Sequence, residues 1–522
     1  MKKIVFGIVL PAVVAVFLGT PYYFGIKAEE SLTEQHRILQ DTFFFEIVSR
    51  KYERGWFTST ETTVIRFHPT VLSNLSKQLP DNLKTVLEKE LTIVNHIKHG
   101  LFADGITPVR ASIRTEFAYH PEVQKVLSRF FNGKTPVKMD NTIYLSGGGK
   151  LNIHVAPFDY EELSGIKLNW KGMTSQVDYR SGFSEYETLF DIPGLEAVLA
   201  DKGNISLEGI TSRTESRGSQ TGLSLGSSDI KMKRFDVRWK ENIDYNIRLN
   251  ELVNAVTDLE IGAFINPTGS IPPSSLSVHN LAYTSQTDEK NGFIDARGHF
   301  TFEKLNYGED QYGPLDIDIA AEHLDGKSLN AVKTAWQKLS TDQTLSGEQI
   351  QEKVLASLRK EGAGLFTNNP VFKINKFDLT IPSGYIKVNG NASFNGLQAA
   401  ELNDFGAMVG KLKANLKLDI SDKVIHSFAV SQARSLLATD SPEDAKAQED
   451  VDETIRLIVD GTLGNLAADG YLTQANGAVQ TELVLENNKV ILNGKPYTVK
   501  SDEELLNELE ADGPPADLPK EE

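Results

Sequence analysis

Two histidines three residues apart come nearest to a metal-binding motif in this sequence. His96 and His99 would share a face if this stretch were helical. Zinc usually needs at least three protein ligands, and Asp104 is the nearest further candidate. The stretch also lacks the internal glutamate of a catalytic zinc helix. We therefore expect packed or loop histidines here, and no bound metal.

Patterns typical of nucleophilic and phosphate-binding enzymes are missing as well. The sequence has no G-x-S-x-G elbow and no S-x-x-K in a penicillin-binding context. Gly147, Gly148 and Gly149 might suggest a phosphate loop, but an alternating strand pattern follows Lys150 where such a loop would lead into a helix. We expect a strand bend there. We predict a protein that is not an enzyme and has no cofactor.

The composition narrows the class of protein further. The 522 residues carry a formal net charge of −17 and no cysteine. The absence of cysteine excludes disulfides, iron–sulfur clusters and thiol catalysis. A nucleic-acid or anionic-headgroup surface needs clustered Lys and Arg, so the charge argues against nucleic-acid binding. Trp170, Trp239 and Trp336 could line a sugar or lipid site, although such residues more often belong to the core.

The N-terminus has the composition of a membrane anchor. Residues 4–26 contain no charged side chain and follow Lys2 and Lys3. About 20 residues of helix cross a bilayer, and flanking lysines tend to stay in the cytoplasm. A cleaved signal peptide is the alternative, but no clean A-x-A site is present. We predict an uncleaved anchor over residues 1–27, with the N-terminus cytoplasmic and the bulk of the chain periplasmic.

Beyond a short helical stalk, the pattern becomes that of β-structure. Residues 43–48 and 57–67 are rich in aromatic and β-branched residues, and the polar residues 53–55 can turn the chain into a hairpin. Phe57, Ile65 and Phe67 share one parity, which indicates one buried face. Similar alternating segments begin at positions 143, 166, 204, 222, 276, 293, 371, 385 and 412.

Such alternation with Gly, Asn or Asp at the turns is typical of antiparallel sheets with one wet face. We therefore predict an α+β, β-dominated fold: a long curved antiparallel β meander with helical insertions, behind one transmembrane helix. The predicted domains are the anchor, a β-rich region over residues 28–500, and an acidic helix with a disordered tail over residues 501–522.

Segments with helix-like spacing interrupt the strands. We predict helical segments near residues 71–91, 327–361 and 421–470. In detail, the spacing predicts helices over residues 71–91, 121–131, 193–199, 329–339, 348–360, 451–466 and 501–510, and one beginning at the polar pair Ser421 and Asp422. Residues 245–265 fit a helix as far as Leu259 and a strand afterwards. A terminal hairpin is expected with Asn487 and Asn488 at its turn.

Three local signatures resemble one protein family. Residues 52–59, YERGWFTS, look like the Y-x-R-G-x-[FW]-[ST]-[ST] element of the YdgA-like family, a bacterial domain of unknown function (945). Residues 99–102, HGLF, look like its H-G-x-F element, and residues 490–495 resemble its closing hairpin. The match covers roughly residues 2–499. It implies a Gram-negative inner-membrane protein with a periplasmic domain, and it transfers no catalytic residue.

The motif residues have structural interpretations of their own. Gly55 would permit a tight turn, Arg54 could pair with an acid or with carbonyls, and Tyr52 and Phe57 would cover it. His99 and Gly100 precede the apolar pair Leu101 and Phe102, which should pack against an edge of the sheet. The complete set of candidate site residues is Tyr52, Arg54, Gly55, Phe57, His99, Gly100, Phe102, Asn493 and Gly494.

Three functions are compatible with this sequence. The first is a non-catalytic, inner-membrane-anchored envelope protein whose concave sheet binds lipid or another apolar ligand, in the general manner of AsmA-like and TamB-like proteins. The second is a periplasmic scaffold that holds an envelope protein through sheet edges and helices. An envelope hydrolase is the third. An open apolar groove would favour the first, and a filled or polar concavity would favour the second.

Overall fold

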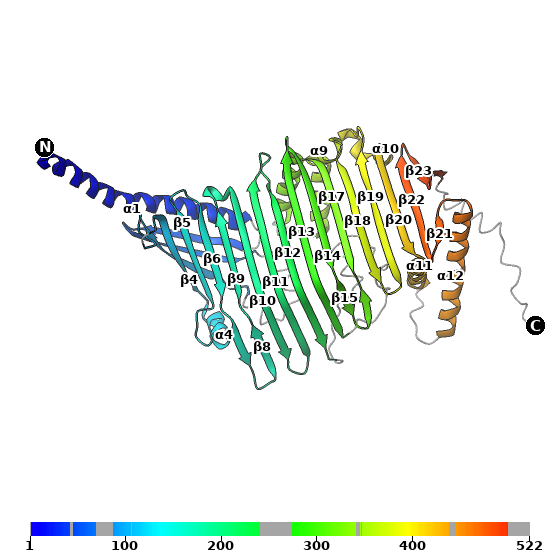
Figure 1. Cartoon of the computed structure of the whole chain (residues 1–522), viewed down its shortest axis with the longest axis horizontal. Helices are drawn as coiled ribbons and strands as arrows, with labels where there is room; N and C mark the ends of the chain where they lie inside the picture. The colour runs from blue at the N-terminus through cyan, green and yellow to red at the C-terminus, as the bar shows by residue number, and fades with distance from the viewer. Residues whose placement is uncertain are drawn as a thin grey trace, which may run out of the picture.

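One antiparallel sheet organises the whole chain. The computed structural model describes residues 2–41, 45–68, 87–105, 107–240, 274–340, 345, 347–437 and 445–498. All 24 described strands belong to a single sheet (Figure 1). The predicted β-dominated, antiparallel fold with several helices is therefore confirmed.

The strands follow each other along the sheet nearly in chain order. The first half contains β1 (Phe45–Arg54), β2 (Thr58–Phe67), β3 (Leu91–His99), β4 (Val109–Ala118), β5 (Val137–Tyr144), β6 (Gly149–Val155), β7 (Phe158–Glu161), β8 (Ile166–Trp170), β9 (Met173–Tyr179), β10 (Glu185–Leu199), β11 (Gly203–Gly218) and β12 (Ser224–Trp239). The second half contains β13 (Ser275–Lys290), β14 (Phe293–Phe302), β15 (Lys304–Tyr307), β16 (Asp310–Tyr312), β17 (Leu315–Asp325), β18 (Val371–Ile381), β19 (Gly384–Phe394), β20 (Leu412–Ser421), β21 (Thr473–Ala475), β22 (Ala478–Glu486), β23 (Lys489–Leu492) and β24 (Lys495–Tyr497).

Hydrogen-bonded pairing defines the order across the sheet. It runs β1-β2-β3-β4-β5-β6-β9-β10-β11-β12-β13-β14-β17-β18-β19-β20-β22-β23-β24. The short strands β8, β15 and β21 pair with β10, β13 and β22, while β7 and β16 extend β8 and β15. Most connections are simple hairpins, as expected for a meander.

Turn residues fix several of these hairpins. Asn487 and Asn488 join β22 to β23 with φ angles of 53° and 59°. A two-residue turn of this kind needs positive φ at both positions, which asparagine tolerates better than most residues. The predicted terminal hairpin is confirmed, with its turn at the expected residues.

Helices occupy the gaps between groups of strands. They are α1 (Lys2–Asp41), α4 (Pro121–Phe131), α7 (Gly326–Ser340), α8 (Gly347–Lys360), α9 (Gly364–Thr367), α10 (Phe405–Lys411), α11 (Asp422–Leu437) and α12 (Ala445–Ala468), with 3-10 turns η1 (Ser181–Phe183) and η2 (Ala399–Asn403). The helices predicted at residues 121–131, 329–339, 348–360 and 451–466 are confirmed. Asp422, part of the predicted polar start, begins α11.

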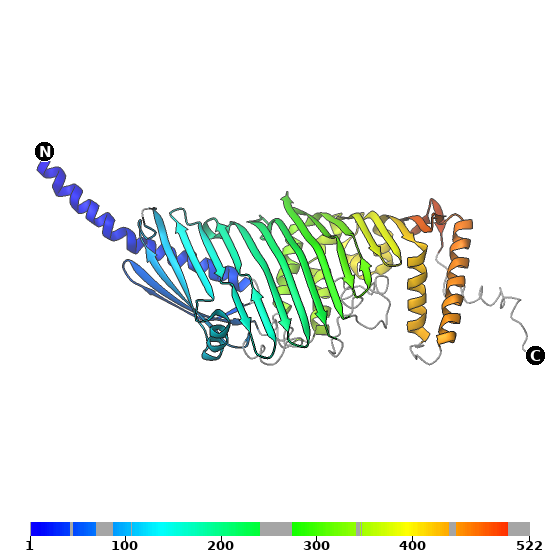
Figure 2. The same cartoon turned by 60° about the horizontal axis from the view of Figure 1, so that its bottom comes forward.

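Helix α1 is continuous from the N-terminus onto the sheet. Its first part projects away from the strands, and its second part lies along them (Figures 1 and 2). The buried residues Pro21, Gly25, Ala28 and Leu32 form one stripe of the helix. Within the part of the chain that the structure describes, the side chains of residues 2–18 excepted, no helix is long and apolar enough to cross a membrane.

We call the sheet face on which α1 lies the inner face. Ala28 and Leu32 pack there against Ile97, Ala111 and Ile143. Further along, α11 places Val424 on the same face, against Leu315, Leu379 and Ile381. The outer face carries cross-strand ion pairs, among them Arg297–Asp318, Lys376–Asp316 and Lys413–Glu486. The inner face of the sheet thus carries apolar clusters, and the outer face carries ion pairs.

The helix predicted over residues 193–199 is wrong, because these residues form the last part of β10. Leu195, Ala197 and Leu199 alternate with Glu196 and Val198, and this part of β10 pairs with β8 and β11. The pairing with β11 skips Pro193, so the missing N–H of proline removes no ladder bond there. The short apolar segment satisfied helical spacing, but its tertiary partners impose the strand.

Several predictions fall outside the described residues. These are the interior of the segment predicted helical at 71–91, the ambiguous segment 245–265, the acidic helix at 501–510 and the tail at 511–522. At the end of the first of these, Leu91 begins strand β3.

Candidate functional site

Most of the candidate residues gather where α1 meets the first strands. Tyr52 and Arg54 end β1, Gly55 and Phe57 form the turn to β2, and His99 ends β3. Sequence positions almost fifty residues apart are adjacent here because β2 pairs with both β1 and β3. Two members of the candidate set lie elsewhere. Asn493 and Gly494 form the turn between β23 and β24, at the opposite end of the sheet.

Gly55 allows the turn that positions this motif. Its N–H donates to the carbonyl oxygen of Thr58 at 2.9 Å. A Cβ atom at residue 55 would lie only 2.5 Å from that same oxygen, so a larger residue would have to displace the backbone. The predicted role of Gly55 in a tight turn agrees with this geometry.

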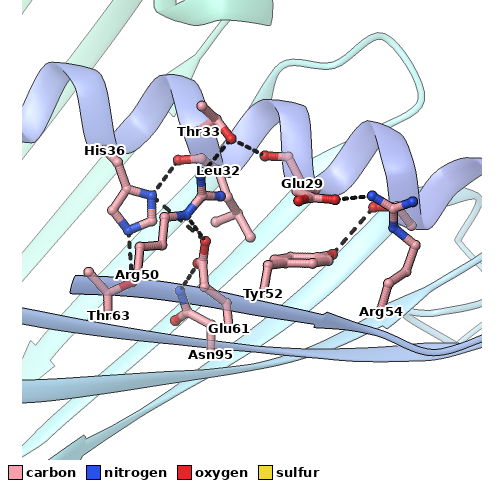
Figure 3. A network of polar contacts seen from close by, with 11 residues as sticks. Glu29, Leu32, Thr33, His36, Arg50, Tyr52, Arg54, Glu61, Thr63 and Asn95 are labelled. Carbon is pink, nitrogen blue, oxygen red and sulfur yellow. Dashed lines mark hydrogen bonds and ion pairs between the residues drawn. The ribbon is translucent and has the colours of Figure 1, made fainter.

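Tyr52 and Arg54 bind α1 from the neighbouring strand. The Tyr52 hydroxyl donates to the carbonyl oxygen of Gly25 at 3.3 Å (Figure 3). Arg54 forms an ion pair with Glu29 and lies over the ring of Tyr22. The acid expected to pair with Arg54 is therefore supplied by the helix.

His99 is buried at the point where α1 leaves the sheet. Its Nδ1–H donates to the carbonyl oxygen of Pro21 at 2.7 Å, which leaves Nε2 to accept from the Ser59 hydroxyl at 3.0 Å. Burial lowers the pKa of the His99 ring. Gly25 must be small because a Cβ there would lie 2.9 Å from His99 Cε1. Gly100 in turn lies beside Pro21.

A buried polar ladder lies next to these residues, and sequence reasoning missed it. Glu61 on β2 is fully buried and accepts from Arg50 Nε at 2.7 Å and from Asn95 Nδ2 at 2.9 Å (Figure 3). Asn95 Oδ1 accepts from the hydroxyl of Thr115 at 2.7 Å. Glu61, Asn95 and Thr115 are direct cross-strand partners on β2, β3 and β4. We call Arg50, Glu61, Asn95 and Thr115 the polar ladder.

Helix α1 closes over this ladder with polar groups of its own. His36 Nδ1–H donates to the Leu32 carbonyl at 2.7 Å, and Nε2 accepts from the Thr63 hydroxyl at 3.1 Å. Arg50 Nη1 donates to Thr33 Oγ1 at 2.8 Å. Burial is the main cause that lowers the pKa of His36, although the neighbouring Glu61 acts in the opposite direction.

The parity predicted for β2 contained a signal for the ladder. Phe57, Ile65 and Phe67 indicated the odd positions as the buried face, and the odd residues Ser59, Glu61, Thr63 and Ile65 are indeed buried. A glutamate at a core position should therefore have raised the question of a buried partner. Phe57 itself is 53% exposed, so it does not cover the turn as expected.

The structure separates the two histidines considered for metal binding. Both lie on strand β3, where residues three apart point to opposite faces. His99 is buried beneath α1, whereas His96 is exposed and lies 3.3 Å from Glu116. In the described ranges, no three His, Asp or Glu side chains lie close enough together to hold a metal ion.

A second candidate site is a hollow on the inner face of the C-terminal half. It has a volume of about 550 Å³ and lies over β13, β14 and β17 to β20. The rim residues Tyr283, Ile319 and Phe372 are exposed although they are large and apolar. The floor of the hollow, between these rim residues, is deep because it is formed by small residues: Ala296, Gly298, Ala321, Gly390 and Ala392.

Among the residues that the structure describes, the inner face around the hollow is uncharged. One cross-strand row reads Ser285, Gly298, Ile319, Ile374, Gly390, Leu416 and Leu483. Arg297 and Lys373 contribute to the hollow's edge, but they form ion pairs with Asp318 and Glu322 on the outer face. The hollow therefore offers apolar contact without a charged group to attract an ion.

The sequence comparisons give a family and no characterised relative. A family model described as bacterial protein of unknown function (DUF945) matches residues 1–500. No curated protein matches the chain.

Proposed function

The chain belongs to the bacterial DUF945 family, and from this premise we propose a non-catalytic envelope protein, anchored in the inner membrane, that binds a lipid acyl chain on its inner face. The observation that carries the proposal is the uncharged hollow bordered by Tyr283, Ile319 and Phe372. Binding sites for small molecules are usually concave, mainly apolar and of roughly 300–1,000 Å³.

The dimensions of the hollow suit an acyl chain. It extends over six neighbouring strands, and a spacing of about 4.8 Å between strands gives a length of about 24 Å. One leaflet contributes about half of a hydrocarbon core that is roughly 30 Å thick. Each methylene buried in the hollow would contribute about 0.8 kcal/mol. Because no charged side chain among the described residues faces the hollow, the alkyl chain is the part of a lipid that fits it.

Helix α1 supports the anchoring part of the proposal. It is one helix from Lys2 to Asp41, and Pro21 contacts the sheet through His99. Residues 4–20 precede this contact, and they contain no charged side chain. At 1.5 Å per residue they would span about 26 Å, near the lower limit for a transmembrane helix. The protein would then be held close to its source of lipid.

Photo-crosslinking in cells that express the full chain tests the ligand. Tyr283 is replaced by p-benzoylphenylalanine, which is another aromatic residue, and adducts are identified by mass spectrometry after irradiation and denaturing purification. The matched control places the same probe at Thr284, the next residue of β13, which faces the opposite side of the sheet. We expect lipid adducts at residue 283 and none at residue 284.

A second variant shows whether the hollow itself is the site. Gly298→Leu should fill it without disturbing the sheet, because a Cβ at Gly298 would lie 3.8 Å from Ile319 and 3.9 Å from Tyr283. We expect this change to reduce the adducts at residue 283 by at least about tenfold, the equivalent of 1.4 kcal/mol. A protein adduct at residue 283 would support the scaffold function instead, and equal lipid adducts at residues 283 and 284 would refute a specific site.

A further inference from the structure

Five exposed aromatic residues lie near the point where α1 leaves the sheet, two of them on the helix itself. They are Tyr22 and Tyr23 on the helix, Trp56 and Phe57 in the β1–β2 turn, and Phe102 in the β3–β4 loop. Their exposed fractions range from 42% for Tyr22 to 59% for Phe102. We call these five residues the aromatic collar. Grouped apolar side chains on a surface usually mark a contact with another surface or with a membrane.

Contacts with α1 place the collar at one level along the helix. The ring centroids of Tyr22 and Trp56 are 5.3 Å apart. The Phe57 carbonyl accepts from the N–H of His99, whose ring holds Pro21. Phe102 follows two residues after Gly100, which itself lies against Pro21.

Strand β1 runs beside α1 in the opposite direction, which explains why its turn reaches this level. Arg50 contacts Thr33, whereas Arg54 contacts Glu29, one helical turn nearer the N-terminus (Figure 3). The β1–β2 turn therefore points toward the N-terminal end of the helix. The collar therefore lies at the end of the docked part of α1 that is nearer the N-terminus.

The chemistry of the collar matches the boundary between lipid and water. Tryptophan and tyrosine prefer this boundary because each ring has an apolar body and a polar group. Two cations accompany the rings, since Lys27 lies 6.0 Å from the ring centre of Tyr23 and Arg54 lies 5.9 Å from that of Tyr22. The uncharged segment, residues 4–26, includes the two tyrosines of the collar.

We infer that the aromatic collar inserts into the headgroup region of the bilayer, so that the β1 end of the sheet rests directly on the membrane. This inference rests on the anchoring part of the proposed function. The continuous helix fixes the sheet relative to the anchor, and the collar supplies a second contact beside it. A net charge of −17 makes apolar insertion, rather than attraction to anionic lipid, the driving force.

Depth-dependent fluorescence quenching tests the collar. The full chain is reconstituted into phosphatidylcholine vesicles, with and without bromine on the acyl chains near the headgroups. A variant that keeps only Trp56 carries Trp170→Phe, Trp239→Phe and Trp336→Phe. The control keeps only Trp336, which is 52% exposed on α7 and far from the collar. We expect brominated lipid to quench Trp56 at least threefold more strongly than Trp336.

Flotation of the vesicles separates the two proposals. A chain that does not float with the vesicles would overturn the anchor, whereas a floating chain with unquenched Trp56 would overturn the collar alone. Phe102→Ser in the Trp56-only background should weaken quenching by moving this side of the collar into water. Quenching equal for Trp56 and Trp336, or unchanged by Phe102→Ser, would also count against insertion. Circular dichroism of each variant confirms that the sheet is retained.

Discussion

The polar ladder makes a quantitative prediction about the docking of α1. In Arg50→Leu, the carboxylate of Glu61 would remain fully buried beneath α1 but would lose the guanidinium that donates to it at 2.7 Å. Breaking one partner of a buried ion pair typically costs about 3–5 kcal/mol. Asn95 continues to donate to Glu61, and the Arg50 side chain is 25% exposed, so we take the lower end, about 3 kcal/mol.

Hydrogen exchange of α1 measures this cost directly. Separation of the helix from the sheet would let water reach Glu61, so the variant favours the open state. At about 1.4 kcal/mol per factor of ten, a cost of about 3 kcal/mol makes the amides of residues 28–36 exchange roughly 150-fold faster. Mass spectrometry of peptides from the full chain resolves this segment. Peptides from β18 and β19, in the C-terminal half of the sheet, serve as the internal control.

A double variant distinguishes the ion pair from simple packing. In Arg50→Leu with Glu61→Leu, no buried charge remains, and replacing a buried pair by apolar residues is often neutral or stabilising. We expect its exchange to return to within about tenfold of the original rate. Exchange in Arg50→Leu that stays within threefold of the original rate would refute the ladder's role, as would a double variant no better than the single one.

The two other predictions concern the same helix. Burial lowers the pKa values of His36 and His99 in the docked state. Below about pH 6.5, the usual pKa of histidine, the open state therefore binds more protons than the docked state. Docking should weaken as the pH falls below this value. Hydrogen exchange of α1, corrected for its intrinsic pH dependence, should show this weaker docking at low pH. His36→Gln should make the exchange less dependent on pH. Protection of α1 that does not vary with pH contradicts the argument. Gly25→Leu should accelerate exchange of residues 21–28 more than tenfold, because a Cβ at residue 25 meets His99. The control Gly19→Leu should not, because a Cβ at residue 19 has no atom within 4 Å. Equal effects of the two variants would show that the fit at Gly25 is unimportant.

Local patterns determined much of the fold. Alternation along each strand and asparagine at the turns predicted an antiparallel meander, because neighbouring strands pair through short connections that the sequence itself displays. The helices at 121–131 and 348–360 were long enough for their periodicity to be unambiguous. Residues 193–199 were too short for that, and pairing with β8 and β11 decided their conformation.

The candidate sites depended more strongly on long-range contacts. The sequence identified Tyr52, Arg54 and His99, but their common partner is α1. No local pattern relates a strand residue to a helix residue that precedes it by 25 to 78 positions. The hollow is similarly non-local, because Gly298 and Gly390 contribute to one surface only when β14, β17, β18 and β19 have paired in this order.

The sequence by itself determined most of the elements, the family and an uncharged N-terminal segment, since these follow from neighbouring residues. The tertiary structure alone decided what covers the buried face of each strand. Glu61 shows the reason: its alternation marks a core position, yet a buried carboxylate is stable only with Arg50 and Asn95 in place, and pairing across three strands together with the docked α1 brings those groups together.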